Sequence, residues 1–168
     1  NQFLKKSNLS KIDFIINCSI KKKYLNSKYN VKFDLDYQIS KKIKKYKNCK
    51  LIFLSSRKIY KPQDNISENG KLLLRENYSK NKYISEEKLK KTLPNRVLVL
   101  RISNLIGNYN FKQSRLHKTF LDFFTENIRK GIIFENKKIY KDFLPINVFS
   151  KIILKLIKNN KTGIFNVS

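Results

Sequence analysis

Tyr78 and Lys82 are the two side chains of this sequence whose types and spacing best suit proton transfer. They lie four residues apart, so on a helix they share one face. A phenol with a pKa of about 10 is a poor base at neutral pH, but a nearby ammonium favours the phenolate. A Tyr tuned in this way exchanges a proton with a hydroxyl or carbonyl group. The spacing alone is not selective, because Tyr24, Tyr37 and Tyr46 also have Lys four residues later.

The position of Tyr78 between two apolar runs distinguishes it from the other tyrosines. The run 50–56 ends in Ser55-Ser56, and the later run 96–104 ends in Arg-Ile-Ser-Asn. An earlier run, 13–19, also ends in small polar residues. Short apolar strands that alternate with amphipathic helices are typical of a parallel α/β sheet whose carboxyl edge carries a ligand site. We therefore predict an α/β fold with a site at that edge.

The elements that must position these residues follow from the hydrophobic periodicity and the turn signals. We expect strands over 13–18, 50–54, 97–101 and 163–167, and helices over 33–47, 79–91, 115–130 and 147–159. The intervening segments are predicted as a polar connection over 20–32, a loop over 57–77, a turn over 105–108, and a short extended pair over 132–135 and 138–144.

The composition supports one folded domain with a hydrophobic core. The chain has 168 residues, of which 40% are hydrophobic, and this is enough to bury a core. The sequence has no apolar run near the roughly 20 residues of a membrane-crossing helix, and its start lacks the pattern of a signal peptide. We expect a soluble, cytoplasmic protein.

The cysteine and histidine content argues against a metal site. Cys18 and Cys49 lie beside predicted strands, and we expect buried thiols and no disulfide. His117 is the only histidine, and the two cysteines lack the spacing of metal ligands. We expect no bound metal and no catalytic role for His117.

The net charge of +26 raises the question of nucleic-acid binding. Only six of the 38 basic residues are Arg, whereas base recognition relies heavily on Arg. The lysines are spread over helices and loops and form no single stripe. We therefore expect an anionic small molecule to be the partner of this charge, and nucleic-acid binding remains an alternative.

Five short motifs occur in a fixed order. Ser56 is followed by Tyr60, the Tyr78/Lys82 pair has Glu86 one turn later, and the next strand carries Leu100, Arg101, Asn104 and Gly107. Lys141-Asp142-Phe143 and Gly163-Ile-Phe-Asn-Val167 complete the series. Over 12–168 this order resembles the extended short-chain dehydrogenases/reductases, specifically the NAD-dependent epimerase/dehydratase group that acts on nucleotide sugars.

The resemblance implies a role for each matching position. Tyr78 would be the catalytic acid/base, Lys82 would lower its pKa and hold the nicotinamide ribose, and Ser56 would bind the reacting substrate oxygen. The residues implied along the cofactor are Asn17, Cys18, Ser19 and Ser55, and a structural role is also open for Ser55. For the substrate, Asn104 would be a contact residue and Lys141 would face the nucleotide diphosphate. A purely structural role also stays open for three of these residues: Ser56 as the cap of a strand, Asn17 as a polar group in the core, and Asn104 as a turn former. We expect Arg101 to be structural.

The resemblance also fixes the expected architecture and its gaps. It implies a partial NAD(P)-binding Rossmann-like domain over 1–108, and a mixed substrate region with the returning helix and strand over 109–168. The glycine-rich unit that cradles the dinucleotide pyrophosphate is missing, since the four glycines begin at Gly70. We therefore expect an internal fragment of a longer protein. Lys141 replaces the usual Arg, and 144–147 replaces an acidic pair.

The function that we expect is epimerisation, dehydration or reduction of a nucleotide-linked sugar with NAD or NADP as cofactor. A homodimer formed through helices is plausible from the resemblance. A non-catalytic nucleotide-binding relative of the same fold is the first alternative, and a basic nucleic-acid-binding domain is the second.

Overall fold

The computed structural model describes residues 9–107, 120–132 and 141–168, and its centre is a parallel sheet. Four strands, β1 (Phe14–Ile16), β2 (Lys50–Ser56), β3 (Val97–Ile102) and β6 (Gly163–Val167), lie in the order β1-β2-β3-β6. All three neighbouring pairs are parallel. The predicted α/β, Rossmann-like class is confirmed, as are the four predicted strands.

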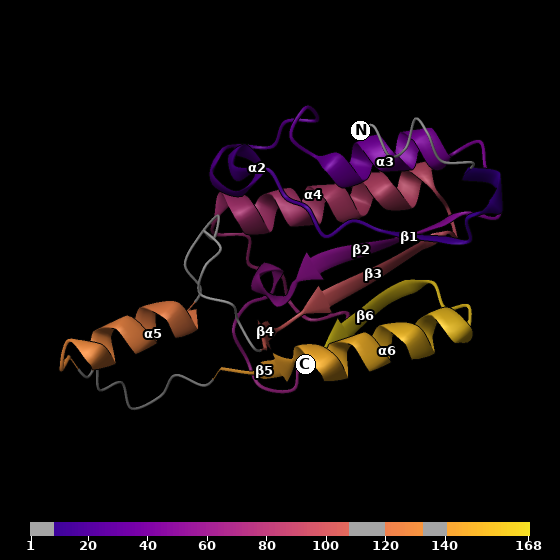
Figure 1. Ribbon diagram of the computed structural model, residues 1–168. Helices are drawn as coiled ribbons and strands as arrows, with labels where there is room; N and C mark the ends of the chain where they lie inside the picture. The colour runs from indigo at the N-terminus through magenta and orange to yellow at the C-terminus, as the bar shows by residue number, and fades with distance from the viewer. Residues whose placement is uncertain (1–8, 108–119, 133–140) are drawn as a thin grey trace.

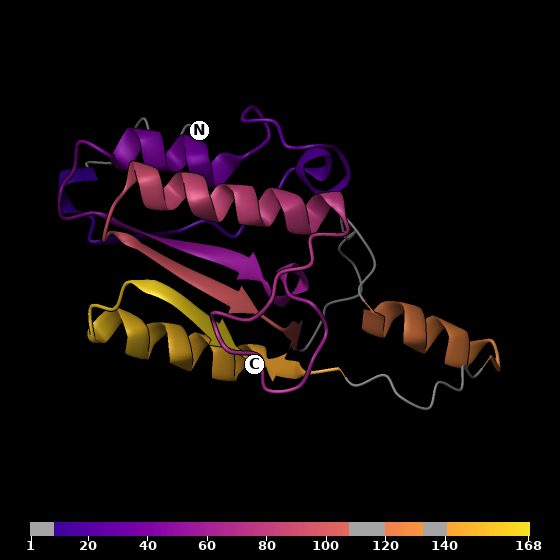
Figure 2. The ribbon, with the colours of Figure 1, turned by 180° about the vertical axis from the view of Figure 1, so that it is seen from behind.

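Helices cover both faces of this sheet, so the fold has three layers: helices, sheet and helix (Figure 1). On one face lie α3 (Leu35–Ile43) and α4 (Asn77–Thr92), and on the other lies α6 (Ile146–Lys158). The view from behind shows the same three layers (Figure 2). Right-handed crossovers between parallel strands place helices on the faces in this way. None of the described helices is long and apolar enough to span a membrane.

Two hydrophobic clusters, one on each side of the sheet, hold the layers together. The side chains of β2 and β3 alternate between the two faces, so both strands contribute to both clusters. Under α3 and α4 the cluster contains Leu9, Ile43, Cys49, Leu51, Phe53, Leu89, Leu93, Val97 and Val99. Under α6 it contains Ile52, Leu98, Leu100, Ile102, Leu144, Phe149 and Val167.

Helix α3 begins two residues later than the periodicity predicts, because Asp34 caps it. The Asp34 carboxylate accepts a hydrogen bond from the Tyr37 backbone N–H at 2.9 Å, which satisfies a donor that the helix itself leaves unpaired. Ile43, the last residue of α3, is fully buried. The predicted helix 79–91 extends at both ends to 77–92 as α4.

Two segments differ from the sequence prediction. The connection 20–32 contains a short helix, α2 (Lys22–Asn26), whose Tyr24 is buried against α4 through a 2.7 Å hydrogen bond to Ser85. Residues 105 and 106 of the predicted turn 105–108 belong instead to a strand, β4 (Asn104–Ile106), which pairs in parallel with β5 (Phe143–Pro145). Residue 108 lies outside the described residues. Both elements depend on partners distant in the sequence, so local periodicity does not reveal them.

The helix predicted over 115–130 is found as α5 (Phe120–Arg129), and 115–119 lies outside the described residues. In both views α5 stands apart from the three layers (Figures 1 and 2), and Phe123, Phe124 and Ile128 are exposed. Most of the predicted extended pair lies outside the described residues as well, and β5 begins only at Phe143.

We expect Leu98→Ala to destabilise the fold much more than Leu154→Ala does. Leu98 is fully buried in the cluster under α6, whereas the Leu154 side chain on α6 is 56% exposed. Truncation of a buried Leu costs about 2–5 kcal/mol, and an exposed one about 0.5 kcal/mol or less. Urea denaturation followed by circular dichroism measures both free energies of unfolding, and equal losses would contradict this core assignment.

Candidate active site

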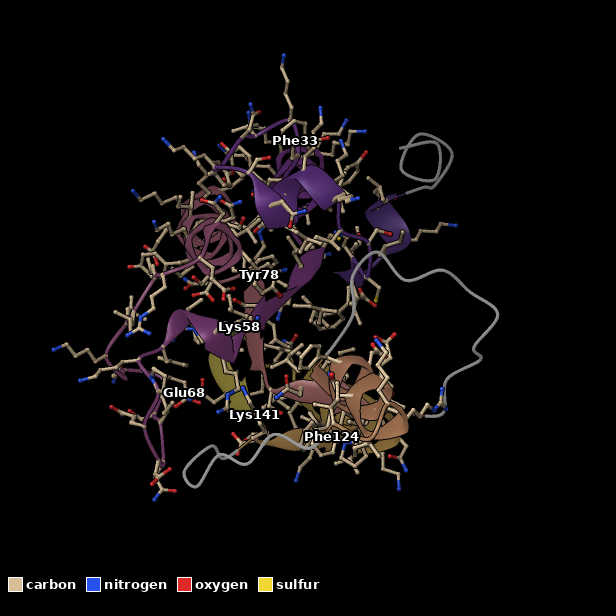
Figure 3. The ribbon with its side chains drawn as sticks, turned by 90° about the vertical axis from the view of Figure 1, so that its left-hand side faces the viewer. Phe33, Lys58, Glu68, Tyr78, Phe124 and Lys141 are labelled. Atoms are coloured by element: carbon tan, nitrogen blue, oxygen red, sulfur yellow. The ribbon has the colours of Figure 1, made fainter. Side chains whose placement is uncertain are left out.

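The carboxyl edge of the sheet gathers the predicted proton-transfer residues. Ser55 and Ser56 end β2, while Tyr78 and Lys82 lie in the first turns of α4, which packs over that strand. Figure 3 looks onto this edge, with Tyr78 and Lys58 close together in the view and Lys141 farther toward β5. The structure therefore brings Tyr78, Lys82 and Ser56 into one place from two elements.

Lys82 is held in an almost fully buried position. Lys82 is only 6% exposed, and its Nζ donates a 2.7 Å hydrogen bond to the Leu54 carbonyl. The same Nζ lies 4.7 Å from the ring centroid of Phe53 and 5.8 Å from that of Tyr78. Burial lowers the pKa of Lys82, and nearby carboxylates, Asp36 foremost, oppose that shift.

The phenol of Tyr78 differs from the sequence-based expectation. Its pKa is raised, because burial disfavours the phenolate, and a hydrogen bond with Ser56 only partly opposes this. The expected lowering of this pKa by Lys82 is therefore wrong for this structure. The ammonium of Lys82 donates to a strand carbonyl, and Tyr78 keeps its proton at neutral pH.

Ser56 lies between Tyr78 and the first turn that follows β2. Its Oγ accepts a hydrogen bond from the Lys58 backbone N–H at 3.2 Å, which caps the short 3-10 helix η2 (Arg57–Ile59). The same side chain hydrogen-bonds the Tyr78 phenol. A hydroxyl that bridges the strand end and the phenol is oriented toward any group that meets Tyr78.

Ser55 belongs to a buried ionic network on the other side of the strand. Its hydroxyl donates to Glu86, and Arg101 donates to the same carboxylate from Nη2 at 2.7 Å. Neither Glu86 nor Arg101 has appreciable exposure to solvent. The predicted structural role of Arg101 is confirmed, and the Ser55 hydroxyl is committed to the carboxylate of Glu86.

The Arg101 guanidinium extends this network to the last strand. Its Nη1 donates to the Tyr60 hydroxyl at 2.5 Å and to the Glu68 carbonyl at 2.8 Å. The Tyr60 hydroxyl in turn donates to Asn166 Oδ1 at 2.8 Å. Several sequence motifs thus meet in one network, through Ser55, Tyr60, Glu86, Arg101 and Asn166. Its members position the strand ends and the α4 helix.

The segment 17–19 follows β1 and forms a tight turn at the same edge. Asn17 Nδ2 donates to the Ser19 carbonyl, and the Ser19 N–H donates to Asn17 Oδ1, both at 3.0 Å. Cys18 in this turn is exposed, so the expectation of a buried thiol there is wrong, because the strand ends at Ile16 and the turn faces solvent. Cys49 is buried as expected, and burial raises the pKa of its thiol.

Asp36 is a buried carboxyl group that the sequence analysis did not identify as a site residue. It lies in the first turn of α3, is 9% exposed, and its Oδ1 has no hydrogen-bond partner among the described residues. Burial raises its pKa to about 6, although the Lys82 ammonium and the Asn17 side chain oppose the shift. Amphipathic periodicity separates only inward from outward positions on a helix, so it gives no signal for a buried carboxyl group.

The two remaining substrate candidates lie at the second, smaller sheet: Asn104 on it and Lys141 just before its strand β5. Asn104 begins β4, and its Nδ2 donates to the Asp142 carbonyl at 3.0 Å. Asp142 also forms an ion pair with Arg57, and the neighbouring Lys141 is exposed. The segment that carries Lys141 is thus fixed to the end of β2 and to β4. His117 lies outside the described residues, and the described part of the chain holds no cluster of metal-ligating side chains.

The fold and this edge define a class of protein: a Rossmann-like α/β protein with Tyr, Lys and Ser side chains at the carboxyl ends of its strands. The NAD dependent epimerase/dehydratase family matches residues 4–168. The chain belongs to this family, and the resemblance found in the sequence is confirmed. No curated protein sequence matches the chain.

Solved structures share the fold at low sequence identity. A UDP-N-acetylglucosamine 4-epimerase from Methanobrevibacter ruminantium M1, in complex with UDP-N-acetylmuramic acid, aligns with a TM-score of 0.71 and 20% identity over 98% of this chain and 59% of its own. The Bordetella bronchiseptica enzyme WbmH, in complex with NAD+, aligns with a TM-score of 0.72 and 16% identity over 93% of this chain and 52% of its own.

A third structure is a dTDP-4-dehydrorhamnose reductase from Bacillus anthracis in complex with NADP. It aligns with a TM-score of 0.65 and 17% identity over 93% of this chain and 56% of its own. The chain thus spans between 52% and 59% of the length of these three structures. Their ligands include a nucleotide sugar, NAD+ and NADP.

We expect Glu86→Gln to destabilise the fold strongly and Glu87→Gln to have almost no effect. Glu86 is fully buried against Arg101, so its neutralisation leaves a buried guanidinium without a counter-ion, which costs about 3–5 kcal/mol. Glu87 is the next residue of α4 and forms a partly exposed pair with Lys90, worth about 0–1 kcal/mol. Urea denaturation compares the two variants, and similar losses would contradict the role given to the network.

We compare the free energy of unfolding of the unaltered protein with that of Asp36→Asn. We expect this difference to shift against the unaltered protein as the pH rises from about 4 to 6. Burial raises the pKa of Asp36 to about 6 in the folded state, so over this range only the unfolded chain ionises and stability decreases as pH rises. The difference should level off above pH 6. Urea denaturation from pH 4 to 7 tests this, with Asp64→Asn as the exposed control, and a difference that stays constant over this range would contradict it.

Proposed function

We propose that this chain carries the proton-transfer site of an NAD(P)-dependent epimerase, dehydratase or reductase of a nucleotide-linked sugar. The observation that carries the proposal is the meeting of Tyr78, Ser56 and Lys82 at the carboxyl edge of the sheet. Membership of the epimerase/dehydratase family and the ligands of the solved relatives support it.

Tyr78 is the catalytic acid/base in this proposal. Its raised pKa keeps the phenol protonated at neutral pH, so in this state it donates a proton to a substrate oxygen. The Ser56 hydroxyl, already hydrogen-bonded to the phenol, holds that oxygen next to it. Lys82, whose ammonium donates to the Leu54 carbonyl, is proposed to act on the cofactor and not on the pKa of Tyr78.

Lys82 and the turn 17–19 are the groups proposed to hold the nicotinamide-ribose end of a dinucleotide. The buried ammonium of Lys82 and the unpaired Oδ1 of Asp36 offer a donor and an acceptor at this edge, so the residues fit a hydroxyl-bearing ribose. Bound there, NAD or NADP supplies the hydride acceptor or donor for the sugar carbon. Asn17, Cys18 and Ser19 would line the cofactor, whereas Ser55 would only support the strand end.

The nucleotide of the substrate would meet the second sheet. Asn104 is proposed to contact substrate or cofactor, and the exposed Lys141 is proposed to face the diphosphate. A lysine is a point charge for phosphate and lacks the bidentate grip of Arg. The division at residue 108, with the catalytic residues before it and the substrate region after it, belongs to this proposal, and a homodimer stays a prediction.

We expect Tyr78→Phe to abolish turnover and Tyr83→Phe, on the same helix, to leave it unchanged. Removal of a proton-transfer group costs about 10²–10⁴ in rate, whereas Tyr83 lies outside the proposed site. The assay mixes the chain with NAD+ and a UDP- or dTDP-sugar and follows products by NMR. Full activity of Tyr78→Phe would contradict the proposal and favour a non-catalytic nucleotide-binding relative.

A further inference from the structure

The two residues after Ser56 are both cations, Arg57 and Lys58, and they have different surroundings. The Arg57 guanidinium forms an ion pair with Asp142. It therefore serves to fix the β5 segment to the end of β2. Lys58 lies on the same short 3-10 turn and points to the Tyr78 side of the edge (Figure 3). Of the two cations, Lys58 is the one that faces the proposed reaction site.

Lys58 is fixed at its backbone and open at its ammonium. Its N–H donates to Ser56 Oγ at 3.2 Å, which determines where the side chain leaves the turn. Its Nζ lies 6.0 Å from the ring centroid of Tyr78. The backbone of Lys58 thus contacts Ser56, and its ammonium lies beside the ring of Tyr78.

The ion pair that Lys58 makes in the structure is weak enough for a ligand to replace. Its Nζ lies 3.6 Å from Glu76 Oε2, and the two side chains are 60% and 66% exposed. An ion pair this open to water contributes about 0–1 kcal/mol. A carboxylate of a bound ligand could therefore replace the Glu76 carboxylate at little cost in free energy. The new contact would again be an ion pair between an ammonium and a carboxylate.

We propose that Lys58 binds a carboxylate on the sugar of the substrate, which makes it a specificity-determining residue. This inference rests on the proposed function, in which Ser56 and Tyr78 contact the reacting sugar. Lys58, which lies next to those two residues, would therefore meet the sugar itself. Lys141, which precedes β5, is the candidate for the diphosphate. An ammonium at the sugar favours an acidic sugar over a neutral one through a charge-assisted hydrogen bond.

Matched pairs of ligands test this inference. UDP-glucuronate and UDP-glucose differ in the carboxylate at the sugar C6, and UDP-N-acetylmuramate and UDP-N-acetylglucosamine differ in a carboxylate on a ring substituent. Isothermal titration calorimetry of the 168-residue chain with NAD+ measures each affinity. We expect the acidic member of at least one pair to bind roughly fivefold tighter, the equivalent of about 1 kcal/mol.

Three variants assign the preference to Lys58. Lys58→Met should remove the preference and leave the affinity for the neutral sugar unchanged. Lys91→Met, the same change at an exposed position near the end of α4, should retain it. Glu76→Gln should strengthen it, because the competing carboxylate is gone. Circular dichroism confirms that each variant is folded, as expected for exposed side chains.

Each other outcome overturns a definite statement. Equal affinities for acidic and neutral sugars overturn this inference and leave the proposed function standing. An equal weakening of both members of a pair by Lys58→Met assigns Lys58 to the diphosphate and also overturns it. If no nucleotide sugar binds at all, the proposed function fails and this inference fails with it.

Discussion

The buried ion pair between Glu86 and Arg101 determines where the carboxyl ends of the strands lie relative to α4. Two charges without solvent contact require every hydrogen-bonding position around them to be filled. Ser55 and Tyr60 fill positions on each partner. Loss of either partner would leave a buried charge unpaired. This network therefore holds α4, the helix that carries Tyr78 and Lys82, in one position against β2.

Burial of titratable groups is the second consequence of that arrangement. Packing of α4 over β2 removes Lys82 and Tyr78 from water, and Asp36 is buried on the neighbouring helix α3. Burial shifts the pKa of each group toward the neutral form. The site thus combines a phenol with a raised pKa, an amine with a lowered pKa and a carboxyl with a pKa of about 6. A bound cofactor or substrate would therefore change the protonation of this site.

Much of the fold could be predicted because its strands are short apolar runs that end in polar residues. Arg101 could be identified as structural, since a charged residue at the end of an apolar strand requires a partner. The helix α2 and the strand β4 could not be predicted, because Tyr24 and Asn104 find their partners on distant segments. The exposure of Cys18 depended on β1 ending after only three residues.

The sequence by itself determined the four strands of the main sheet, the longer helices between them, the family, and the placement of Ser56, Tyr78 and Lys82 at the carboxyl edge, because these follow from local periodicity and motif order. The tertiary structure alone decided the state of each side chain. It directed the Lys82 ammonium to the Leu54 carbonyl, committed Ser55 to Glu86, and placed Lys58 beside Tyr78. Burial and distance between remote residues set pKa values and contacts, and neither quantity is contained in a linear pattern.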